Sequence, residues 1–313
     1  MFDTFWRFAV ERQRIFFRRL GGAAYPWTDD PILRDHRFTN VYRASDRVSQ
    51  FLIDHVIEGS GQEPSDIFFR TVLFKIFNRI KTWELLEERL GGIHVWSFEP
   101  DGYDALLSDA MLRGQRIYSA AYIMPMPSMG AGRKHTNHLR LLARMLADGL
   151  PARLARTRSL EEAYGLLLAY PSIGPFLAYQ YVIDLNYSEL LNFSEMDFVV
   201  PGPGAIDGIH KCFADLGGLT EAELIREVTE HAEEEFECRG LEFRSLWGRP
   251  LQLIDCQNLF CEVSKYARLA HPNVKGTSSR VRIKQSYRPD PEPIGYRYPA
   301  KWKLTVRGPA ATT

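Results

Sequence analysis

Apolar residues recur at helical spacing along nearly the whole chain, and this pattern constrains the fold more than any other feature. Phe5, Phe8, Ile15, Phe16 and Leu20 fit one face of a helix. Further helical stretches are predicted near residues 48–57, 66–90, 103–118, 138–149, 159–169, 175–186, 205–216, 221–237 and 250–269. Alternation typical of strands is confined to short pieces at 279–285 and 301–306. We therefore predict an all-α, mainly helical fold.

The chain is long and apolar enough to build a large core. It has 313 residues, 45% of them apolar, and its 39 Lys and Arg balance 39 Asp and Glu. Such a length fits one large domain or two lobes. The sequence has no apolar run that could span a membrane and no apolar core of a signal peptide near its start. We expect a soluble, cytoplasmic protein with a helical domain over residues 1–269 and an irregular, basic extension over 270–313.

Cysteine and histidine spacing gives little support for a metal centre. Cys256 and Cys261 lack the C-x-x-C spacing of a zinc site and lie in an apolar stretch. His135 and His138 could share a helical face, but no further ligand type lies close in the sequence. We predict no metal and no cofactor.

Charge is balanced overall but not locally. Residues 221–237 hold eight Glu and one Arg, whereas residues 265–307 hold eleven Lys and Arg and two acids. A basic tract of this kind suits a polyanion, because each phosphate that it neutralises releases counterions. Arg280, Arg282 and Lys284 are therefore candidate DNA contacts. The alternative is a solubilising tail that folds against the acidic helix.

A long connector precedes the helix predicted at 138–149. Its segment Gly130-Ala131-Gly132-Arg133-Lys134 lacks the spacing of a phosphate-binding P-loop. Arg133 and Lys134, together with helix-start amides, could still hold a DNA phosphate. The alternative is an exposed loop that Thr136 or Asn137 caps.

Residues 160–186 predict a helix, a tight turn and a second helix. Gly174 permits a turn conformation that a Cβ would hinder, and Pro175 suits the first position of a helix. The start of the second helix would then leave amides available to a phosphate oxygen. An ordinary helical hairpin is the alternative.

The segment Pro171-Ser172-Ile173-Gly174-Pro175-Phe176-Leu177-Ala178 resembles the hairpin of helix-hairpin-helix DNA glycosylases, with Ser172 at the first glycine of the pattern. The resemblance implies DNA contacts at Ser172, Gly174 and Pro175. It also implies a catalytic Asp beyond the second helix, which here is Asp197, 23 residues after Gly174, with Glu195 as the second candidate. The motif V-D-T-x-x that follows in that superfamily is absent.

A closer resemblance is to one branch of that superfamily, described as α-glutamyl/putrescinyl-thymine pyrophosphorylases and the helical domain of 5-hydroxymethyluracil DNA kinases. The stretches that carry it are 11–14, 26–33, 38–50, 74–78, 197–204 and 255–262. This branch implies work on modified pyrimidines in DNA. Some relatives build such bases, and others excise them as a defence against phages.

The same resemblance implies a base pocket. Arg43, Asp46 and Gln50 are predicted to share one side of a helix. Asn258 and Glu262 share a face of a later helix. The alternative is that both sets are solvated helix faces. Asn78 lies in a stretch that resembles the minor-groove segment of the glycosylases and would probe the space left by an extruded base.

These observations predict a monofunctional DNA glycosylase. Its substrate would be double-stranded phage DNA carrying hypermodified pyrimidines such as glucosylated 5-hydroxymethylcytosine. Phe176 occupies the position where strand-cutting relatives have a Lys, so we expect abasic sites as the product. We expect no obligate protein partner. The alternatives are a transferase that hypermodifies DNA thymine and a DNA-binding accessory to a 5-hydroxymethyluracil DNA kinase.

Overall fold

The computed structural model describes residues 1–59, 61–290 and 295–306. These residues form helices joined by irregular segments, and the described ranges contain no β-strand, only the isolated bridges His36–Ser286 and Leu246–Arg249. The all-α prediction is confirmed. The strand-like alternation at 279–285 and 301–306 produces no β-strand among the described residues. Arg307 and Glu292, which were part of the charge pattern, lie outside the described residues.

The chain divides into two compact units. Unit 1 takes residues 1–46 and 198–296 with the segment from Ala300 onward, and unit 2 takes residues 47–197 and 297–299. Unit 2 is thus nearly continuous in sequence, whereas unit 1 is assembled from separate stretches. Residues 270–290 belong to unit 1, so the units divide the chain at positions other than residue 269.

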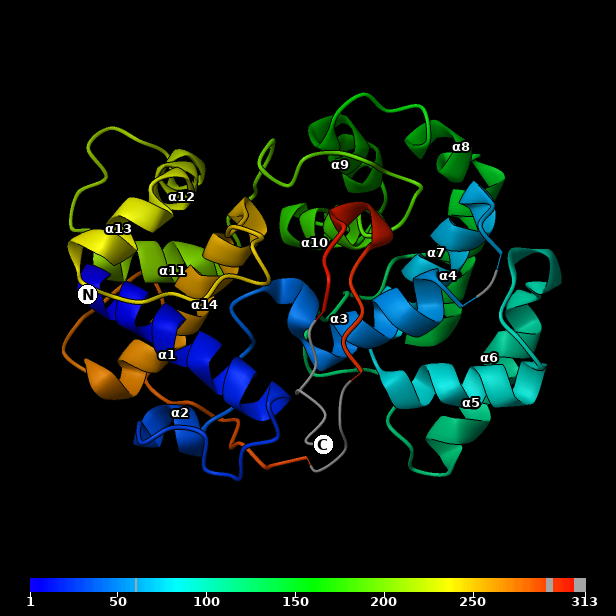
Figure 1. Ribbon diagram of the computed structural model, residues 1–313. Helices are drawn as coiled ribbons and strands as arrows, with labels where there is room; N and C mark the ends of the chain where they lie inside the picture. The colour runs from blue at the N-terminus through cyan, green and yellow to red at the C-terminus, as the bar shows by residue number, and fades with distance from the viewer. Residues whose placement is uncertain (60, 291–294, 307–313) are drawn as a thin grey trace. The chain divides into compact units, whose positions relative to one another are not determined.

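Unit 1 is built around two helices that pack closely, α11 (Pro203–Cys212) and α14 (Leu253–Ala270) (Figure 1). A Cβ on Gly204 would collide with the sulfur of Cys261, and one on Gly208 would collide with the carbonyl oxygen of Phe260. The two glycines lie one helical turn apart, so they open one face of α11 to the backbone of α14. The glycine-rich segment after Asp197 therefore serves helix packing.

Aromatic side chains complete the core of unit 1. The ring centroids of Phe5 and Phe260 are 4.5 Å apart, and those of Trp6 and Phe236 are 4.8 Å apart. These pairs join the first helix of the unit to α14 and α13. The remaining elements of unit 1 are α1 (Phe2–Leu20), α2 (Pro31–Asp35), η1 (Arg43–Ser45), α12 (Glu221–Glu230), α13 (Ala232–Cys238) and η4 (Ala300–Trp302).

Unit 2 is centred on α4 (Pro64–Phe77), whose residues from Asp66 to Phe77 are all buried. It packs against α10 (Pro175–Leu185), which is buried from Leu177 to Leu185. A helix buried on all sides belongs in the middle of a unit. The other elements are α3 (Arg47–Phe51), the π-helical η2 (Leu52–Ile57), α5 (Ile80–Leu90), η3 (Val95–Ser97), α6 (Pro100–Leu112), α7 (Lys134–Ala147), α8 (Leu150–Leu154) and α9 (Leu160–Leu168).

Several predicted helices are divided or shortened by local backbone conformations. The stretch 66–90 forms two helices, because Asn78 takes a left-handed conformation (φ 47°) and ends α4. The stretch 103–118 ends at Leu112, before Gly114 with φ 75°. The stretch 221–237 is divided at His231. In the part of the chain that the structure describes, no helix has both the length and the apolar character needed to cross a membrane.

Candidate functional site

The hairpin predicted from the sequence is formed by α9, a turn over residues 169–174, and α10. Ser172 has φ 64°, a left-handed conformation that glycine adopts at little cost. Gly174 precedes α10 without any side-chain cap, and nothing lies within 4 Å of the place where its Cβ would be. Gly174 and Pro175 are exposed. The start of α10 is therefore accessible to a ligand.

The two candidate carboxylates diverge. Residues 194–197 form a turn, in which the amide of Asp197 donates to the carbonyl oxygen of Ser194 at 3.2 Å. Glu195 is only 4% exposed, whereas the side chain of Asp197 lies at the surface. The side chain of Asn186 holds the preceding segment through two 3.0 Å hydrogen bonds to the backbone of Phe193. Of the two, Asp197 is the carboxylate that a substrate in solution can reach.

A buried polar network lies next to the hairpin. The ammonium of Lys75 is 3.0 Å from a carboxylate oxygen of Asp184 on α10, and it donates to the side chain of Asn78 at 3.0 Å. It also lies 4.5 Å from the ring centroid of Tyr122, which stacks on Phe176. Asn78 is 3% exposed, so contact between its side chain and DNA would require this network to open.

The long connector before α7 is folded around one buried amide. Asn137 accepts hydrogen bonds from the amides of Met129 and Ala131 and donates to the carbonyl oxygens of Ala131 and Arg133. Arg133 stays exposed, and its guanidinium lies 3.7 Å from Asp104. Lys134 covers the ring of Tyr118 at 4.6 Å, and burial lowers its pKa. Arg133 is therefore the more accessible cation at the start of α7.

The two histidines of α7 are bound within unit 2. His135 lies 2.9 Å from the hydroxyl of Ser108, and His138 lies between the hydroxyl of Tyr118 and the carbonyl oxygen of Pro125. Burial lowers the pKa of His138 to about 4, so its ring is neutral near pH 7. No group of three or more His, Cys, Asp or Glu that could hold a metal occurs among the described residues.

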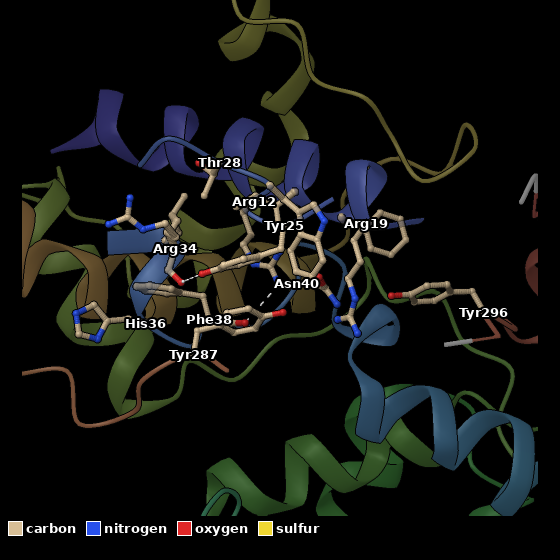
Figure 2. Close-up of a pocket in the computed structure, with 14 residues that line it drawn as sticks. Arg12, Arg19, Tyr25, Thr28, Arg34, His36, Phe38, Asn40, Tyr287 and Tyr296 are labelled. Carbon is tan, nitrogen blue, oxygen red and sulfur yellow. Dashed lines mark hydrogen bonds between the residues drawn. The ribbon is translucent and has the colours of Figure 1, made fainter. Parts of the chain in front are cut away.

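Unit 1 contains a pocket that no sequence prediction named (Figure 2). Its cavity volume is about 40 Å³, it is open to solvent, and aromatic and guanidinium groups dominate its wall. Its lining residues are Arg12, Ile15, Phe16, Arg19, Tyr25, Trp27, Thr28, Leu33, Arg34, His36, Phe38, Asn40, Tyr287 and Tyr296. They come from α1, α2, the segments beside α2 and the segment that follows α14. None of the described lining residues is acidic.

Three of the predicted base-pocket residues lie beneath one wall of this pocket. Asp46 accepts a hydrogen bond from the amide of Asn40 at 2.7 Å, and Glu262 accepts one from the amide of Thr39 at 3.0 Å. Asn258 donates to the hydroxyl of Thr39 at 3.1 Å. Burial raises the pKa of Asp46 to about 6. These side chains position the segment that includes the lining residue Asn40.

The helix predicted to carry Arg43, Asp46 and Gln50 on one side is not continuous, and that prediction is wrong. Arg43 belongs to the 3-10 turn η1, Asp46 is extended (ψ 143°), and α3 begins only at Arg47. The side chain of Asp46 binds the amide of Asn40, which favours this break. Arg43 is 2% exposed, and its amide donates to Asp255. Gln50 is 2% exposed and accepts a hydrogen bond from the amide of Arg297.

The basic segment after α14 is irregular, as predicted, but its backbone is tied to unit 1. The amide of Ser278 donates to Asp207 on α11 at 2.6 Å, and a Cβ on Gly276 would collide with Asp207. The amide of Arg37 donates to the carbonyl oxygen of Gln285 at 3.0 Å. The side chains of the three predicted DNA contacts remain exposed: Arg280, Arg282 and Lys284.

Comparison with known proteins relates the chain to enzymes of modified DNA. A family model described as "5-hmdU DNA kinase, helical domain" matches residues 1–276. The chain belongs to this family. A 5-hmdU DNA kinase of Bacillus phage SP10 is 29% identical over an alignment of 288 positions, which covers 85% of this chain and 45% of the phage protein. The chain therefore spans less than half the length of that relative. No solved structure gives a significant match.

Three of the motif stretches named from the sequence contribute to the pocket of unit 1. The motif stretches 11–14, 26–33 and 38–50 meet at the pocket of unit 1 and supply Arg12, Trp27 and Asn40 to its wall. Their shared resemblance to one family was the signal in the sequence that could have located this part of the pocket. Tyr287 and Tyr296 lie beyond the matched residues, and only the folded chain brings them to the same pocket.

Proposed function

We propose that this member of the family is a DNA glycosylase of the helix-hairpin-helix type. Its substrate would be DNA that carries hypermodified pyrimidines, such as glucosylated 5-hydroxymethylcytosine, and its product an abasic site. The observation that carries this proposal is the exposed carboxylate of Asp197, which follows a hairpin whose second helix begins uncapped at Gly174 within the same unit. The membership in a DNA-kinase helical family supports a modified-DNA substrate.

The reaction requires an extruded nucleotide, because the N-glycosidic bond is inaccessible inside a duplex. The C1′–N bond breaks, and its electron pair leaves with the base while positive charge develops on the sugar. The carboxylate of Asp197 stabilises that charge and orients a water molecule. The water oxygen forms the new bond to C1′, and its proton passes through Asp197 to solvent or to the departing base.

DNA would be held by backbone amides and exposed cations. Ser172, Gly174 and Pro175 present the start of α10 to a phosphate oxygen, as helix N-termini commonly do. Arg133 and Lys134 at the start of α7 belong to the same unit. The exposed side chains of Arg280, Arg282 and Lys284 add phosphate contacts from unit 1, each of which releases counterions.

Strand cleavage is not part of the proposal. Schiff-base chemistry needs a reachable amine, and Phe176 occupies the hairpin position where other glycosylases have one. Lys75 and Lys211 are buried and lie 3.0 Å and 2.8 Å from the carboxylates of Asp184 and Asp207. An amine buried in such a pair is not accessible to the sugar of a bound nucleotide. The enzyme would act without a cofactor or an obligate protein partner, and its biological role would be defence against phages.

Product analysis on three DNA substrates tests the proposal. Purified protein is incubated with glucosylated, hydroxymethylated and unmodified phage DNA, and released bases and abasic sites are measured by mass spectrometry. Asp197→Asn should lower excision at least about 100-fold while DNA binding persists. The matched control is Glu189→Gln, an exposed carboxylate of the segment between α10 and Asp197, which should excise at the wild-type rate. Wild-type excision by Asp197→Asn rejects the catalytic assignment.

A second candidate is favoured by the family match itself, since the named relative is a kinase more than twice as long as the matched region. In that case the chain would either transfer a group to the 5-methylene of an activated thymine or present modified DNA to a kinase. The same incubation, extended to DNA carrying phosphorylated 5-hydroxymethyluracil, separates the possibilities. A released base indicates excision, an enlarged base indicates transfer, and unchanged DNA with retained binding indicates the accessory role.

A further inference from the structure

The pocket of unit 1 combines aromatic rings and guanidinium groups in one lining. Tyr25, Trp27 and Tyr287 form a continuous aromatic cluster, with Tyr25 and Tyr287 stacked at 6.2 Å and 28°. Arg12 and Arg19 lie among these rings, and Arg34 borders them with its guanidinium turned away (Figure 2). The lining therefore presents flat apolar faces and positive charge together.

We propose that this pocket binds a nucleotide, whose base stacks on Tyr25 and Tyr287 and whose phosphate contacts Arg19. The proposal concerns unit 1 alone and does not depend on which reaction Asp197 performs. It rests on the exposure of the rings, the engagement of the three arginines and the polar group that faces the same space.

The rings offer surface that the protein core does not use. Tyr25 is 41% exposed, and Trp27 and Tyr287 are partly exposed. Tyr25 is fixed by its hydroxyl, which donates to the carbonyl oxygen of Arg34 at 3.1 Å (Figure 2). The indole of Trp27 donates to the carbonyl oxygen of Ala23 at 2.7 Å. Rings that are fixed and exposed lose little entropy when a base stacks on them, and each such contact strengthens binding substantially.

The three arginines are engaged to different extents. Arg12 donates to the carbonyl oxygens of Thr39 and Phe38, and Arg34 forms an ion pair with Asp35 at 2.7 Å. Among the described residues, Arg19 makes one long hydrogen bond, 3.5 Å to the carbonyl oxygen of Asp290, and its guanidinium lies 5.5 Å from the ring centroid of Trp27. Arg19 is therefore the cation best placed to exchange a weak protein contact for a phosphate oxygen.

Asn40 supplies an amide to the same lining. Its backbone amide is held by Asp46, and its side-chain nitrogen donates to the carbonyl oxygen of Ser45 at 2.7 Å. The side-chain oxygen can accept a hydrogen bond from the edge of a base. A purely anionic ligand would not need the aromatic cluster, and a purely apolar ligand would leave the guanidinium groups without a counterpart. A base joined to a phosphate satisfies both.

Calorimetry with a deoxynucleoside 5′-monophosphate, on the full-length protein, tests the proposal. Tyr287→Ala should weaken binding about tenfold, the low end of what a base–aromatic stack contributes. Arg19→Gln should weaken it to a similar extent and reduce its salt dependence. Tyr287→Phe keeps the ring and should bind as the wild type does. Arg14→Gln removes an exposed cation of the same helix outside the pocket and should also leave binding unchanged.

A second titration distinguishes the source of the nucleotide. A short single-stranded oligonucleotide that binds with the same sensitivity to Tyr287→Ala indicates a nucleotide within a strand, whereas binding of the monophosphate alone indicates a free nucleotide. Absence of binding by both probes overturns the proposal, as does equal affinity of the wild type and Tyr287→Ala. Asp197→Asn should bind both probes normally, so failure of the glycosylase proposal would be seen separately.

Discussion

In unit 2 the hairpin residues and the two candidate carboxylates lie on one short stretch, from Ser172 to Asp197, on which Gly174, Pro175 and Asp197 are exposed and Glu195 is buried. In unit 1 the pocket is assembled from residues as far apart as Arg12 and Tyr296. The two regions also treat charge differently. Beside the hairpin of unit 2, Lys75 is held in a buried ion pair with Asp184, as Lys211 is with Asp207 in the core of unit 1, whereas in the pocket Arg19 makes one 3.5 Å hydrogen bond to a described residue. A charge held in a buried ion pair supports the structure, whereas a charge with only one weak protein contact is available to bind a ligand.

Breaking the buried ion pair of unit 2 should have the largest effect. Lys75→Met leaves the 1%-exposed carboxylate of Asp184 without its ammonium and should lower the free energy of unfolding by about 3–5 kcal/mol. The exposed pair Arg113–Asp109 in the same unit is the control, and Arg113→Met should change stability by less than about 0.5 kcal/mol. Denaturant titrations measure both. Equal effects of the two substitutions would show that burial does not distinguish these charges.

The double variant Lys75→Met/Asp184→Asn sharpens that experiment. Removing both charges should recover much of the stability, because the main cost of the single substitution is an uncompensated buried charge. If the double variant is no more stable than Lys75→Met, packing around the lysine chain rather than charge accounts for the loss.

Alanine substitutions at two glycines, one in each unit, test how closely their helices are packed. Gly208→Ala places a methyl group against the backbone of α14 and should destabilise the protein by about 1–3 kcal/mol. Gly165→Ala, in the middle of α9 with nothing within 4 Å, should stabilise it by up to about 1 kcal/mol through helix propensity. Thermal unfolding of the two variants measures the expected loss of stability for Gly208→Ala and the expected gain for Gly165→Ala. A neutral Gly208→Ala would contradict the close packing of α11 on α14.

The pH dependence of stability tests Asp46 beneath the pocket wall. Burial raises its pKa from an ordinary value near 4 to about 6, so the folded state binds more protons than the unfolded state between those values. Stability from this group is therefore greatest at low pH and falls as the pH rises from 4 through 6, by about 1–2 kcal/mol. Asp46→Asn keeps an acceptor for Asn40 and should remove that fall. Denaturant titrations at pH 4.5 and pH 7 measure the free energy of unfolding of both proteins. If it changes with pH by the same amount in both, the pKa of Asp46 is not raised by folding.

The exposed cations of the basic segment should give the smallest effect. Replacing Arg280, Arg282 and Lys284 with Gln should weaken DNA binding about tenfold at moderate salt. The slope of the logarithm of the binding constant against the logarithm of the salt concentration should fall in magnitude by up to about three. Their backbone contacts do not involve these side chains, so folding should be unaffected. Arg226→Gln on the acidic helix α12, where Arg226 pairs with Glu230, is the control. An unchanged slope would leave the segment with a structural role alone.

Local sequence patterns predicted which helices form in this fold better than they predicted where those helices begin and end. Helical spacing located nearly all the long helices, since apolar periodicity is a property of neighbouring residues. The interruptions at Asn78 and His231 depend on single backbone conformations that the periodicity does not encode. The hairpin at Gly174 was predictable because turn and helix start are contiguous. The pocket was not, since Tyr287 and Tyr296 reach it only through the path of the chain after α14.

The relation between Asp197 and Glu195 shows the same limit on a smaller scale. Two residues that are two positions apart face the same side of an extended strand and different sides of a turn. The sequence left both possibilities open, and the turn at Ser194 decides between them.

The discontinuity of unit 1 has a consequence for biosynthesis. A ribosome releases α1 first, yet its partner helix α14 emerges more than two hundred residues later. Until then Phe5, Trp6 and Phe8 lack the surface that buries them, while the nearly continuous unit 2 can fold as soon as it has been translated. The aromatic pocket of unit 1 can therefore form only after unit 2 has been translated, once the segment carrying Tyr287 has left the exit tunnel.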